Sequence, residues 1–381
     1  MSGTFDARAP RVALVRGRYD PAGGAERFVQ AALAALEAQG ASITLVTREW
    51  PRADGSAIVL RPFHVGSLWR DRAFARAACS ELASRRFDLV QSHERIACCD
   101  LYRAGDGVHA QWLEERARVQ SPLARAATRV SPRHRWLLSM ERALFASPRL
   151  RAVICNSEMV RSEIAQRFGV APEKLVLIRN AVDAESFQPA LAAQWRESMR
   201  QQLDIPAEAR VALHVGSGFE RKGVLTLLHA VARTSDAWAV VVGRDKHAGR
   251  YRQAAERLGI ASRVRFVGAV SDVRPYYGLA DAFVLATLYD PQPNAALEAM
   301  ACGLPVVTTP KCGAAELLSE GESGYVRDAL DVEGIAEALG QLASFDVARP
   351  MGAAARAAVL PYTPARMAAE FVALYRRLLA R

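Results

Sequence analysis

The sequence predicts an α/β protein with two domains, each built on a parallel sheet. Short apolar runs of strand type alternate with helical segments along the chain, which is the pattern of parallel strands joined by helical crossovers. A glycine-rich loop follows the first strand of each half. The length of 381 residues exceeds the usual size of a domain with a single hydrophobic core, so two domains are expected. Hydrophobic residues make up 51% of the chain, which favours folded domains over disorder.

The first half opens with a strand, a glycine-rich loop leading into a helix, and a second strand, the order that begins a Rossmann-like domain. A later helix has Ser157 as its predicted N-cap. A polar turn ending near Pro189 marks the domain junction, so we predict a first domain over residues 1–187. The strands predicted for this half are residues 11–15, 42–47, 87–91, 152–155 and 174–178.

The second half repeats this alternation over residues 188–360. Helices are predicted after Lys222 and over three further stretches, and an alanine-rich helix is expected after Pro350. The three stretches are residues 247–258, 273–279 and 294–302, and the predicted strands are residues 211–215, 238–242, 264–267, 283–285 and 306–309. A last segment, residues 361–381, completes the chain.

The net charge of +10 is concentrated in one segment of the first half. Nine arginines there are opposed only by Glu141 and interleave with large apolar residues, which is typical of binding to an anionic membrane surface. An ordinary solvated helix face is the alternative. Nucleic acid is disfavoured because the sequence has no helix-turn-helix, zinc or RNA-binding signature. The arginines are Arg116, Arg118, Arg125, Arg129, Arg133, Arg135, Arg142, Arg149 and Arg151.

The cysteines and the apolar runs bear on the compartment. The six cysteines form no CxxC motif, so we predict reduced thiols in a cytoplasm and no structural zinc. No apolar run approaches the roughly 18 residues that cross a bilayer, and the first residues match neither a signal peptide nor a membrane anchor. We therefore expect a cytoplasmic protein that contacts the membrane peripherally.

The most informative stretch surrounds a strand-to-helix turn, where Asp290 and Glu298 stand eight positions apart. A helix N-terminus offers unpaired N–H groups and a positive dipole end, so a diphosphate near Asn294 and Ala295 would need no metal. Glu298, about one turn into the helix, can accept hydrogen bonds from both ribose hydroxyls. Asp290 faces the place of a sugar on the far phosphate. Carboxylates near a helix start also stabilise the helix alone, so the pair by itself leaves both interpretations open.

The full run FVLATLYDPQPNAALEAMACGLPVVTTPKCGAAE resembles the C-terminal signature of glycosyltransferase family 4, in which a Glu, seven residues and a second Glu precede a small-residue helix. Asp290 replaces the first Glu and sets its carboxylate back by about 1.5 Å, so we expect its contact with the donor sugar to differ. The resemblance implies the GT-B architecture, with two Rossmann-like domains facing a central cleft and a C-terminal helix crossing back to the first domain. It also implies retention of anomeric configuration.

The loop from Gly216 to Gly223 joins flexible backbone to two cations, Arg221 and Lys222, as expected where a leaving diphosphate develops charge. Its glycines do not have the GxGxxG spacing of a dinucleotide fingerprint. In family 4 an Arg and a Lys at this place bind the diphosphate, and the resemblance assigns that role to Arg221 and Lys222. A surface turn with two solvated cations is the alternative. Because the chain also lacks a DxD motif, we predict metal-independent transfer without any cofactor.

Weaker candidates lie in other loops that follow strands. Gly23 and Gly24 would let a substrate approach the backbone closely, although a turn that starts a helix explains them equally well. The resemblance implies that an Asp or His of the first domain contacts the donor sugar, with Asp106 preferred and His109 second. An alternative loop contains His93 and Glu94. In the second domain, residues 243–246 are placed near phosphate and Val270 near the base edge.

Two further runs, GSGFERKGV and VVGRDK, are similar to those of lipopolysaccharide core glucosyltransferases that use UDP-glucose and a heptose acceptor. The resemblance implies transfer of a hexose, glucose first, from a UDP-sugar to a lipopolysaccharide core heptose at the inner face of the cytoplasmic membrane. One alternative uses GDP-mannose or UDP-N-acetylglucosamine with another lipid-linked or glycan acceptor. The others are a nonenzymatic basic module that binds a membrane or nucleic acid, and a nucleotide-sugar epimerase. The sequence leaves the donor hexose, linkage and oligomeric state open.

Overall fold

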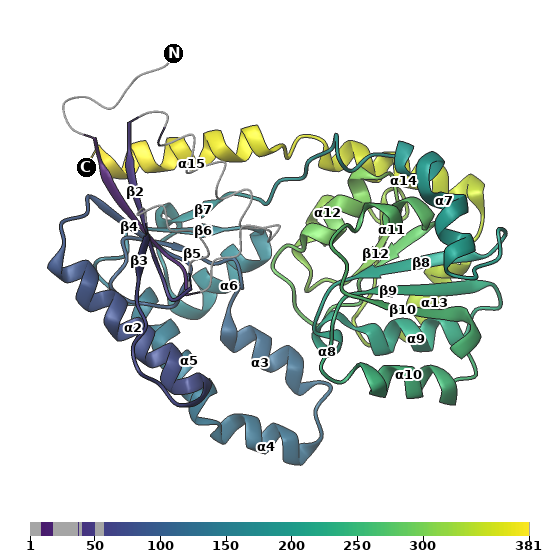
Figure 1. Cartoon of the computed structure of the whole chain (residues 1–381), viewed down its shortest axis with the longest axis horizontal. Coiled ribbons are helices and arrows are strands. Elements are labelled where there is room, and N and C mark those ends of the chain that lie inside the picture. The colour runs from purple at the N-terminus through teal and green to yellow at the C-terminus, as the bar shows by residue number, and fades with distance from the viewer. Residues whose placement is uncertain (1–8, 18–36, 38–39, 50–56, 381) are drawn as a thin grey trace. The chain divides into compact units, whose positions relative to one another are not determined.

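The computed structural model describes residues 9–17, 37, 40–49 and 57–380, and the chain divides into two compact units (Figure 1). The first unit comprises residues 1–180 and 364–381, and the second comprises residues 181–363. The sequence had placed the two boundaries after residues 187 and 360. The last helix, α15 (Pro364–Leu379), belongs to the first unit.

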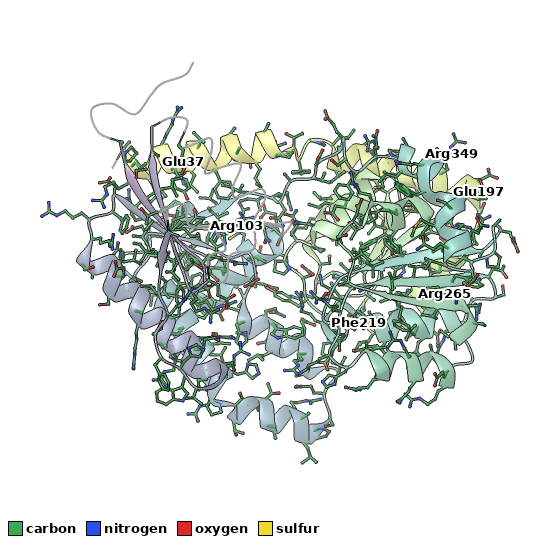
Figure 2. All side chains as sticks on the ribbon, in the orientation of Figure 1. Glu37, Arg103, Glu197, Phe219, Arg265 and Arg349 are labelled. Carbon is green, nitrogen blue, oxygen red and sulfur yellow. A yellow bond between two sulfur atoms is a disulfide. The ribbon has the colours of Figure 1, made fainter. Side chains whose placement is uncertain are left out.

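The first unit contains, within its described residues, a seven-stranded sheet in the order β3-β2-β1-β4-β5-β6-β7 with every pairing parallel. The loops that follow β1, β4, β5 and β6 therefore leave the sheet at one edge. Arg103, the last residue of β5, lies at this carboxyl edge (Figure 2). The strands are β1 (Arg11–Val15), β2 (Ser42–Thr47), β3 (Ala57–Val59), β4 (Leu89–Ser92), β5 (Leu101–Arg103), β6 (Ala152–Cys155) and β7 (Leu175–Leu177).

Three of the described helices of the first unit begin at a serine whose side chain caps them. Ser157 accepts a hydrogen bond from the Val160 N–H at 3.3 Å, which confirms the predicted N-cap of α6. Among the described residues no helix combines the length and apolarity needed to cross a bilayer. The helices are α2 (Gly66–Ser84), α3 (His109–Ala117), α4 (Pro122–Val130), α5 (Pro132–Phe145), α6 (Glu158–Phe168) and the 3₁₀ helix η1 (Pro172–Lys174).

The second unit contains a six-stranded parallel sheet in the order β10-β9-β8-β11-β12-β13. Its strands are β8 (Arg210–Val215), β9 (Ala237–Val242), β10 (Val264–Gly268), β11 (Ala282–Val284), β12 (Val306–Thr308) and β13 (Gly324–Val326). Its helices are α7 (Ala190–Gln202), α8 (Phe219–Lys222), α9 (Val224–Ala232), α10 (Ala248–Arg257), α11 (Arg274–Leu279), α12 (Asn294–Ala301), α13 (Val332–Gln341) and α14 (Phe345–Val359), with η2 (Ala261–Arg263) and η3 (Gly313–Leu317). The predicted class, two parallel-sheet Rossmann-like domains, is confirmed.

The expectation that an alanine-rich helix starts after Pro350 is wrong, because α14 begins at Phe345 and includes this proline. A proline inside a helix removes one backbone hydrogen bond. The buried face of α14 continues across it through Ala348, Met351 and Ala355, so packing against the sheet outweighs that loss.

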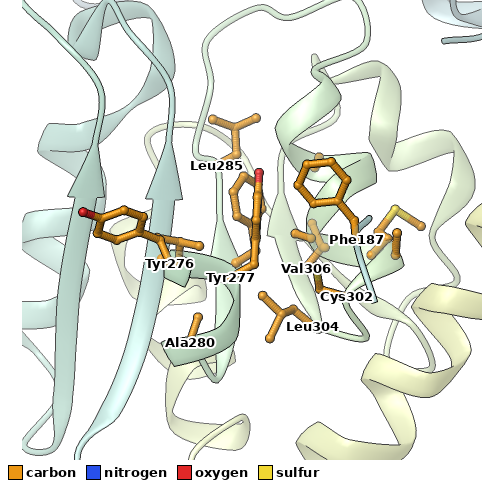
Figure 3. Packing of buried hydrophobic residues seen from close by; sticks show 14 of the residues in the cluster. Phe187, Tyr276, Tyr277, Ala280, Leu285, Cys302, Leu304 and Val306 are labelled. Atoms are coloured by element: carbon orange, nitrogen blue, oxygen red, sulfur yellow. The ribbon is translucent and has the colours of Figure 1, made fainter. Parts of the chain in front are cut away.

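Two apolar cores cover the two faces of the second sheet, as alternation of side chains along a strand requires. Leu213 of β8 packs in one core, and its neighbour Ala212 packs in the other. The first core also contains Phe187 and Tyr277, whose rings meet edge to face at 5.6 Å between centroids (Figure 3). This core lies beneath α12 and supports the start of that helix.

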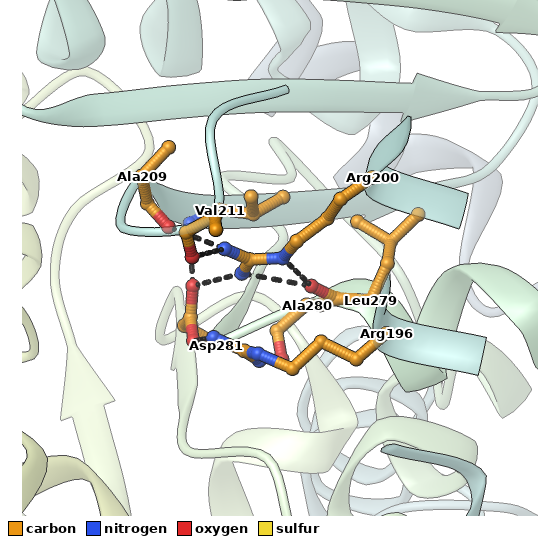
Figure 4. Close-up of polar contacts among 8 residues, drawn as sticks. Arg196, Arg200, Ala209, Val211, Leu279, Ala280 and Asp281 are labelled. Carbon is orange, nitrogen blue, oxygen red and sulfur yellow. Dashed lines mark hydrogen bonds and ion pairs between the residues drawn. The ribbon is translucent and has the colours of Figure 1, made fainter. Parts of the chain in front are cut away.

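A buried ion pair ties α7 to the beginning of β11 (Figure 4). Asp281 accepts from Arg200 at 2.8 Å, from Arg196 at 2.5 Å and from the Val211 N–H at 2.8 Å. The remaining Arg200 donors reach the carbonyls of Ala207, Ala209 and Leu279. Every charge in the network therefore has hydrogen-bonding partners, which is the condition for burying an ion pair.

The expectation that all cysteines are reduced is wrong for two of them. Cys79 of α2 and Cys98, in the loop after β4, form a disulfide with Cα atoms 5.8 Å apart. The packing of α2 on the sheet brings them together, and a sequence separation of 19 residues gives no sign of that proximity. Cys99, Cys155, Cys302 and Cys312 are free and buried.

We expect alkylation of the unfolded, unreduced protein to modify only the four free cysteines, and alkylation after reduction by dithiothreitol to modify all six. Opening a crosslink of this span should lower the free energy of unfolding by about 3 kcal/mol, measured by urea titration. The Cys79→Ser variant is the control, since dithiothreitol should leave its stability unchanged. Modification of six thiols without reductant would contradict the crosslink.

Candidate active site

The glycine-rich loop of the second unit leaves the carboxyl end of β8 and turns at once into α8. Gly218 and Gly223 flank this short helix with left-handed backbone, at φ 80° and 72°. A Cβ atom on Gly223 would lie 1.8 Å from the carbonyl oxygen of Ala286, so only glycine fits there. Asp245 fixes the start of α8 by accepting from the Phe219 N–H at 2.8 Å.

The loop brings Lys222, the last residue of α8, to Asp290. Both side chains are buried, and the Lys222 ammonium donates to Asp290 Oδ2 in a short contact. Arg221 is half-buried, with its guanidinium 3.7 Å from the same oxygen. Gly216 allows this arrangement, because a Cβ atom there would lie 3.3 Å from Lys222 Cε. Loops that are distant in sequence thus form one charged cluster, because β8 and β11 are neighbours in the sheet.

The cluster carries a net positive charge. Arg221 and Lys222 contribute two cations against one carboxylate, Asp290. His214 of β8 adds none, because burial, and then the charge of Lys222, lower its pKa to about 3. The net positive charge of the cluster can therefore attract a further anion. Near neutral pH, His214 stays neutral and does not change that charge.

The N-terminus of α12 follows β11 at the same edge of the sheet. Asn294 and Ala295 form its first turn, and Glu298 lies half-buried one turn further on. The Tyr277 hydroxyl donates to Glu298 Oε2 at 2.8 Å and lies 3.1 Å from the Ala295 carbonyl oxygen. Burial and the charge of Glu298 raise the pKa of Tyr277, so its hydroxyl keeps the proton that orients this carboxylate.

Sequence reasoning missed Tyr277, because a tyrosine on the apolar face of α11 looks like any other core residue. Of the weaker candidates in this unit, Val270 packs its side chain against the apolar core, which leaves only its backbone for a ligand. Within residues 243–246, Asp245 supports α8, and the Arg244 N–H donates to Ser217 Oγ at 3.0 Å. These residues hold the glycine-rich loop in place.

In the first unit, the turn after β5 carries Asp106 and leads to His109, the first residue of α3. Asp106 is exposed. His109 is buried with its Nε2 3.2 Å from His134 Nδ1, and burial together with the charge of Arg95 lowers its pKa to about 3. The structure gives His109 a packed position and leaves Asp106 accessible. Gly23 and Gly24 lie outside the described residues.

Glu141 has a role that the sequence did not reveal. It is buried, and its two oxygens accept from the N–H groups of His109 at 2.7 Å and Ala110 at 3.2 Å. Arg95 donates to the same carboxylate at 3.2 Å and to the Gly107 carbonyl at 3.0 Å. Glu141 thus caps α3 and fixes the turn that carries Asp106.

Glu141 is the one acid within residues 116–151, but acids outside that segment also pair with its arginines. Glu115 directly precedes the segment, whereas folding brings in Asp71 and Asp100, which the linear sequence could not show. The ion pairs are Arg118 with Glu115, Arg133 with Asp71, and Arg149 with Asp100.

The alternative loop after β4 is held by hydrogen bonds of its own. Glu94 accepts from the Gly17 N–H at 2.9 Å, which joins the ends of β4 and β1. His93 is half-buried, with its Nε2 3.0 Å from the side-chain nitrogen of Gln91. Asp106, His93 and Glu94 all follow strands at the carboxyl edge of the first sheet.

Two parallel-sheet Rossmann-like units of this topology place the chain in the GT-B fold class. Two family models match the chain in succession, Glycosyltransferase Family 4 over residues 22–186 and Glycosyl transferases group 1 over residues 209–344. The chain belongs to glycosyltransferase family 4.

Two bacterial relatives share sequence with this chain. The lipopolysaccharide glucosyltransferase WaaG of Escherichia coli (strain K12) is 26% identical over 323 residues, which cover 83% of this chain and 84% of WaaG. The lipopolysaccharide core biosynthesis glycosyltransferase LpsE of Rhizobium meliloti (strain 1021) is 38% identical over 143 residues, 38% of this chain. The chain spans less than half of LpsE, 42% of its length.

Solved structures share the fold at lower identity. The crystal structure of WaaG, a glycosyltransferase involved in lipopolysaccharide biosynthesis, has a TM-score of 0.79 at 23% identity and covers 94% of this chain and 98% of that one. Anabaena HepE in complex with UDP-glucose has a TM-score of 0.71 at 19% identity, with coverage of 96% and 99%. At these identities the likeness shows the fold alone.

Proposed function

We propose that the protein is a retaining glycosyltransferase that moves a hexose, most simply glucose, from a UDP-sugar to a lipopolysaccharide core heptose. The observation that carries this proposal is the buried pair of Lys222 and Asp290 beside Arg221. A sugar diphosphate presents a leaving anion and a set of hydroxyls, and this cluster offers cations and a carboxylate within one site. WaaG is a lipopolysaccharide glucosyltransferase, and HepE was solved with UDP-glucose, which supports these substrates.

In this proposal each residue of the candidate site in the second unit has a specific role. Arg221 and Lys222 neutralise the diphosphate as its bond to the sugar breaks, and the first turn of α12 adds its N–H groups. Glu298, oriented by Tyr277, accepts from the ribose hydroxyls of uridine. Asp290 accepts from hydroxyls of the sugar. This arrangement supplies positive charge from side chains and amides, so we propose that transfer needs no divalent ion.

Retention follows in this proposal from a front-face substitution. The acceptor oxygen attacks the anomeric carbon on the face from which the diphosphate leaves, and a departing phosphate oxygen takes the proton of the acceptor hydroxyl. The new glycosidic bond forms as the bond from carbon to phosphate oxygen breaks, so both proton and electron pair are accounted for. Asp290 is held by Lys222 in an ion pair, which makes its carboxylate a poor nucleophile for a double displacement.

A donor and acceptor panel tests this function. The protein is incubated with UDP-glucose, UDP-galactose, UDP-N-acetylglucosamine, GDP-mannose or ADP-glucose, with and without lipopolysaccharide core truncated at heptose, and free nucleotide is measured. The proposal expects UDP release from UDP-glucose that depends on the acceptor. Release of GDP would favour the mannosyl alternative, and conversion of a donor without acceptor would indicate an epimerase. No turnover of any donor would favour a nonenzymatic module.

Glu298→Ala is expected to weaken UDP binding by about thirtyfold, because two hydrogen bonds to a charged acceptor are lost. Titration calorimetry measures the affinity. Tyr277→Phe should weaken it by only a few fold, since the carboxylate remains but loses its orienting partner. Equal UDP affinity in Glu298→Ala and wild type would remove Glu298 from the site.

An exposed helix of the first unit supports a lipid-embedded acceptor. No residue of α4 is buried, Leu123 is 84% exposed and Val130 69%, and Arg125 and Arg129 lie on the same helix. Arginines beside exposed apolar side chains fit the interface of an anionic bilayer. We therefore propose that the enzyme docks peripherally on the inner face of the cytoplasmic membrane through α4.

Co-sedimentation with vesicles tests this docking. The double variant Arg125→Ala/Arg129→Ala should bind phosphatidylglycerol vesicles about thirtyfold more weakly, from about 1 kcal/mol for each arginine. The control Arg250→Ala/Arg349→Ala removes the same charge from exposed positions of the second unit and should bind like the wild type. An equal loss in both variants would mean that net charge, and not α4, attracts the protein.

A further inference from the structure

Three side chains link the C-terminal helix to the carboxyl edge of the first sheet. Tyr375 of α15 is 1% exposed, and its hydroxyl donates to Gln91 Oε1 in a short contact. Gln91 is fully buried on β4, and its Nε2 lies 3.0 Å from Nε2 of His93. Tyr375 and Gln91 stand 284 positions apart in the sequence, so only the return of α15 to the first unit joins them.

The direction of these hydrogen bonds follows from the buried tyrosine. Burial raises the pKa of Tyr375, so the phenol keeps its proton, and a buried hydroxyl needs an acceptor. Among the described residues that acceptor is Gln91, whose carbonyl oxygen must therefore face Tyr375. The amide nitrogen of Gln91 then faces His93 and can only donate.

His93 must accept this bond through a ring nitrogen that carries no proton. Burial, followed by the charges of Arg103 and Arg16, lowers the pKa of His93 well below its usual value, so the ring is neutral. A neutral imidazole carries one proton, and with Nε2 accepting, that proton lies on Nδ1. His93 stands at the end of β4, where its backbone N–H donates to the Val15 carbonyl at 3.0 Å.

We propose that α15, through Tyr375 and Gln91, selects the tautomer of His93, and that His93 presents its Nδ1–H to a sugar hydroxyl of the substrate. Tyr375 and Gln91 act as positioning residues, and His93 is the residue that touches substrate. The substrate part of this inference rests on the proposed function. One consequence is specific: Nδ1 gives a hydrogen bond, so His93 holds an oxygen and does not remove its proton.

Nuclear magnetic resonance on protein labelled with ¹⁵N-histidine reads the tautomer without any substrate. The signal of His93 is identified by its loss in His93→Asn. The wild type should show the Nδ1–H form, and Tyr375→Phe should show a mixture with Nε2–H, because Gln91 is then free to turn its amide over. An Nε2–H form in the wild type, or an unchanged tautomer in Tyr375→Phe, would overturn the proposal.

The chain offers a matched control in the second unit. Tyr325 also donates its hydroxyl to a glutamine, Gln341, so Tyr325→Phe removes the same kind of bond far from His93 in sequence and in the other unit. This variant should leave the His93 signal unchanged. A change of tautomer in both variants would show that the effect comes from general loosening of the fold. That result would contradict the proposal that Tyr375 and Gln91 select the tautomer of His93.

Kinetics test the contact with substrate. His93→Asn removes the imidazole and should itself lower kcat/KM. Tyr375→Phe should lower kcat/KM about tenfold in the wild-type background and cause no further loss in the His93→Asn background. An equal loss of kcat/KM in both backgrounds would show that Tyr375 acts only through the fold and not through His93, which would overturn the proposal. If the wild type turns over no donor, the proposed function fails. The tautomer measurement still decides whether Tyr375 and Gln91 select the tautomer of His93.

Discussion

Lys222→Ala should lower kcat by a factor of about 10²–10³, the usual effect of removing a preorganised donor from a developing negative charge. The ammonium of Lys222 is buried at the carboxyl edge of the second sheet, and the low dielectric there increases its effect on a leaving diphosphate. Arg221 is more exposed, so it compensates only partly. Release of UDP at saturating donor and acceptor measures the loss.

Two controls separate chemistry from folding. Lys174→Ala removes an ammonium that bonds the Leu150 carbonyl at 2.8 Å in the first unit, and it should retain the wild-type kcat. Because Lys222→Ala leaves Asp290 buried without its closest cation, the double variant Lys222→Ala/Asp290→Asn should recover stability but not turnover. A folded Lys222→Ala enzyme with nearly the wild-type kcat would show that this lysine does not serve the leaving group.

Asp281→Ala is expected to lower the free energy of unfolding by about 3–5 kcal/mol, measured by urea titration. The substitution leaves the Arg200 guanidinium, 3% exposed, without its counter-charge in the interior of the second unit. It also leaves the Val211 N–H without its side-chain acceptor at the start of β8. The loss should therefore exceed that of an ordinary surface ion pair several fold.

Asp272→Ala provides the comparison. Asp272 pairs with Arg274 at 2.8 Å, but the two side chains are 42% and 49% exposed, so breaking this pair should cost about 0.5 kcal/mol. If Asp281→Ala costs no more than Asp272→Ala, the buried network does not anchor α7.

The sequence predicted the bounds of the strands better than it predicted the side-chain contacts between distant segments. The strands at residues 11–15, 42–47 and 152–155 have the predicted bounds, because each is a short apolar run. Three strands of three residues each, β3, β5 and β13, were missed. Pro350 displaced the predicted start of α14, because local propensity was given more weight than the apolar face that continues past it.

The site shows the same division between local and tertiary information. The positions of Lys222 and Asp290 beyond the carboxyl ends of strands could be predicted, and that is where ligands of parallel sheets bind. Their contact could not be predicted, because it depends on β8 and β11 being neighbours. The partner of Glu298 is on α11, and His93 is linked through β4 to α15. No sequence pattern around Glu298 or His93 predicts these contacts.

Calorimetric titration of UDP into the chelator-treated protein tests the central claim most directly, namely that Arg221, Lys222 and the start of α12 hold the diphosphate without a divalent ion. We predict saturable binding in the presence of EDTA, unchanged by added Mg²⁺ or Mn²⁺ and strongly weakened in Lys222→Ala. Binding that disappears in EDTA and returns with either metal would contradict this account of the site.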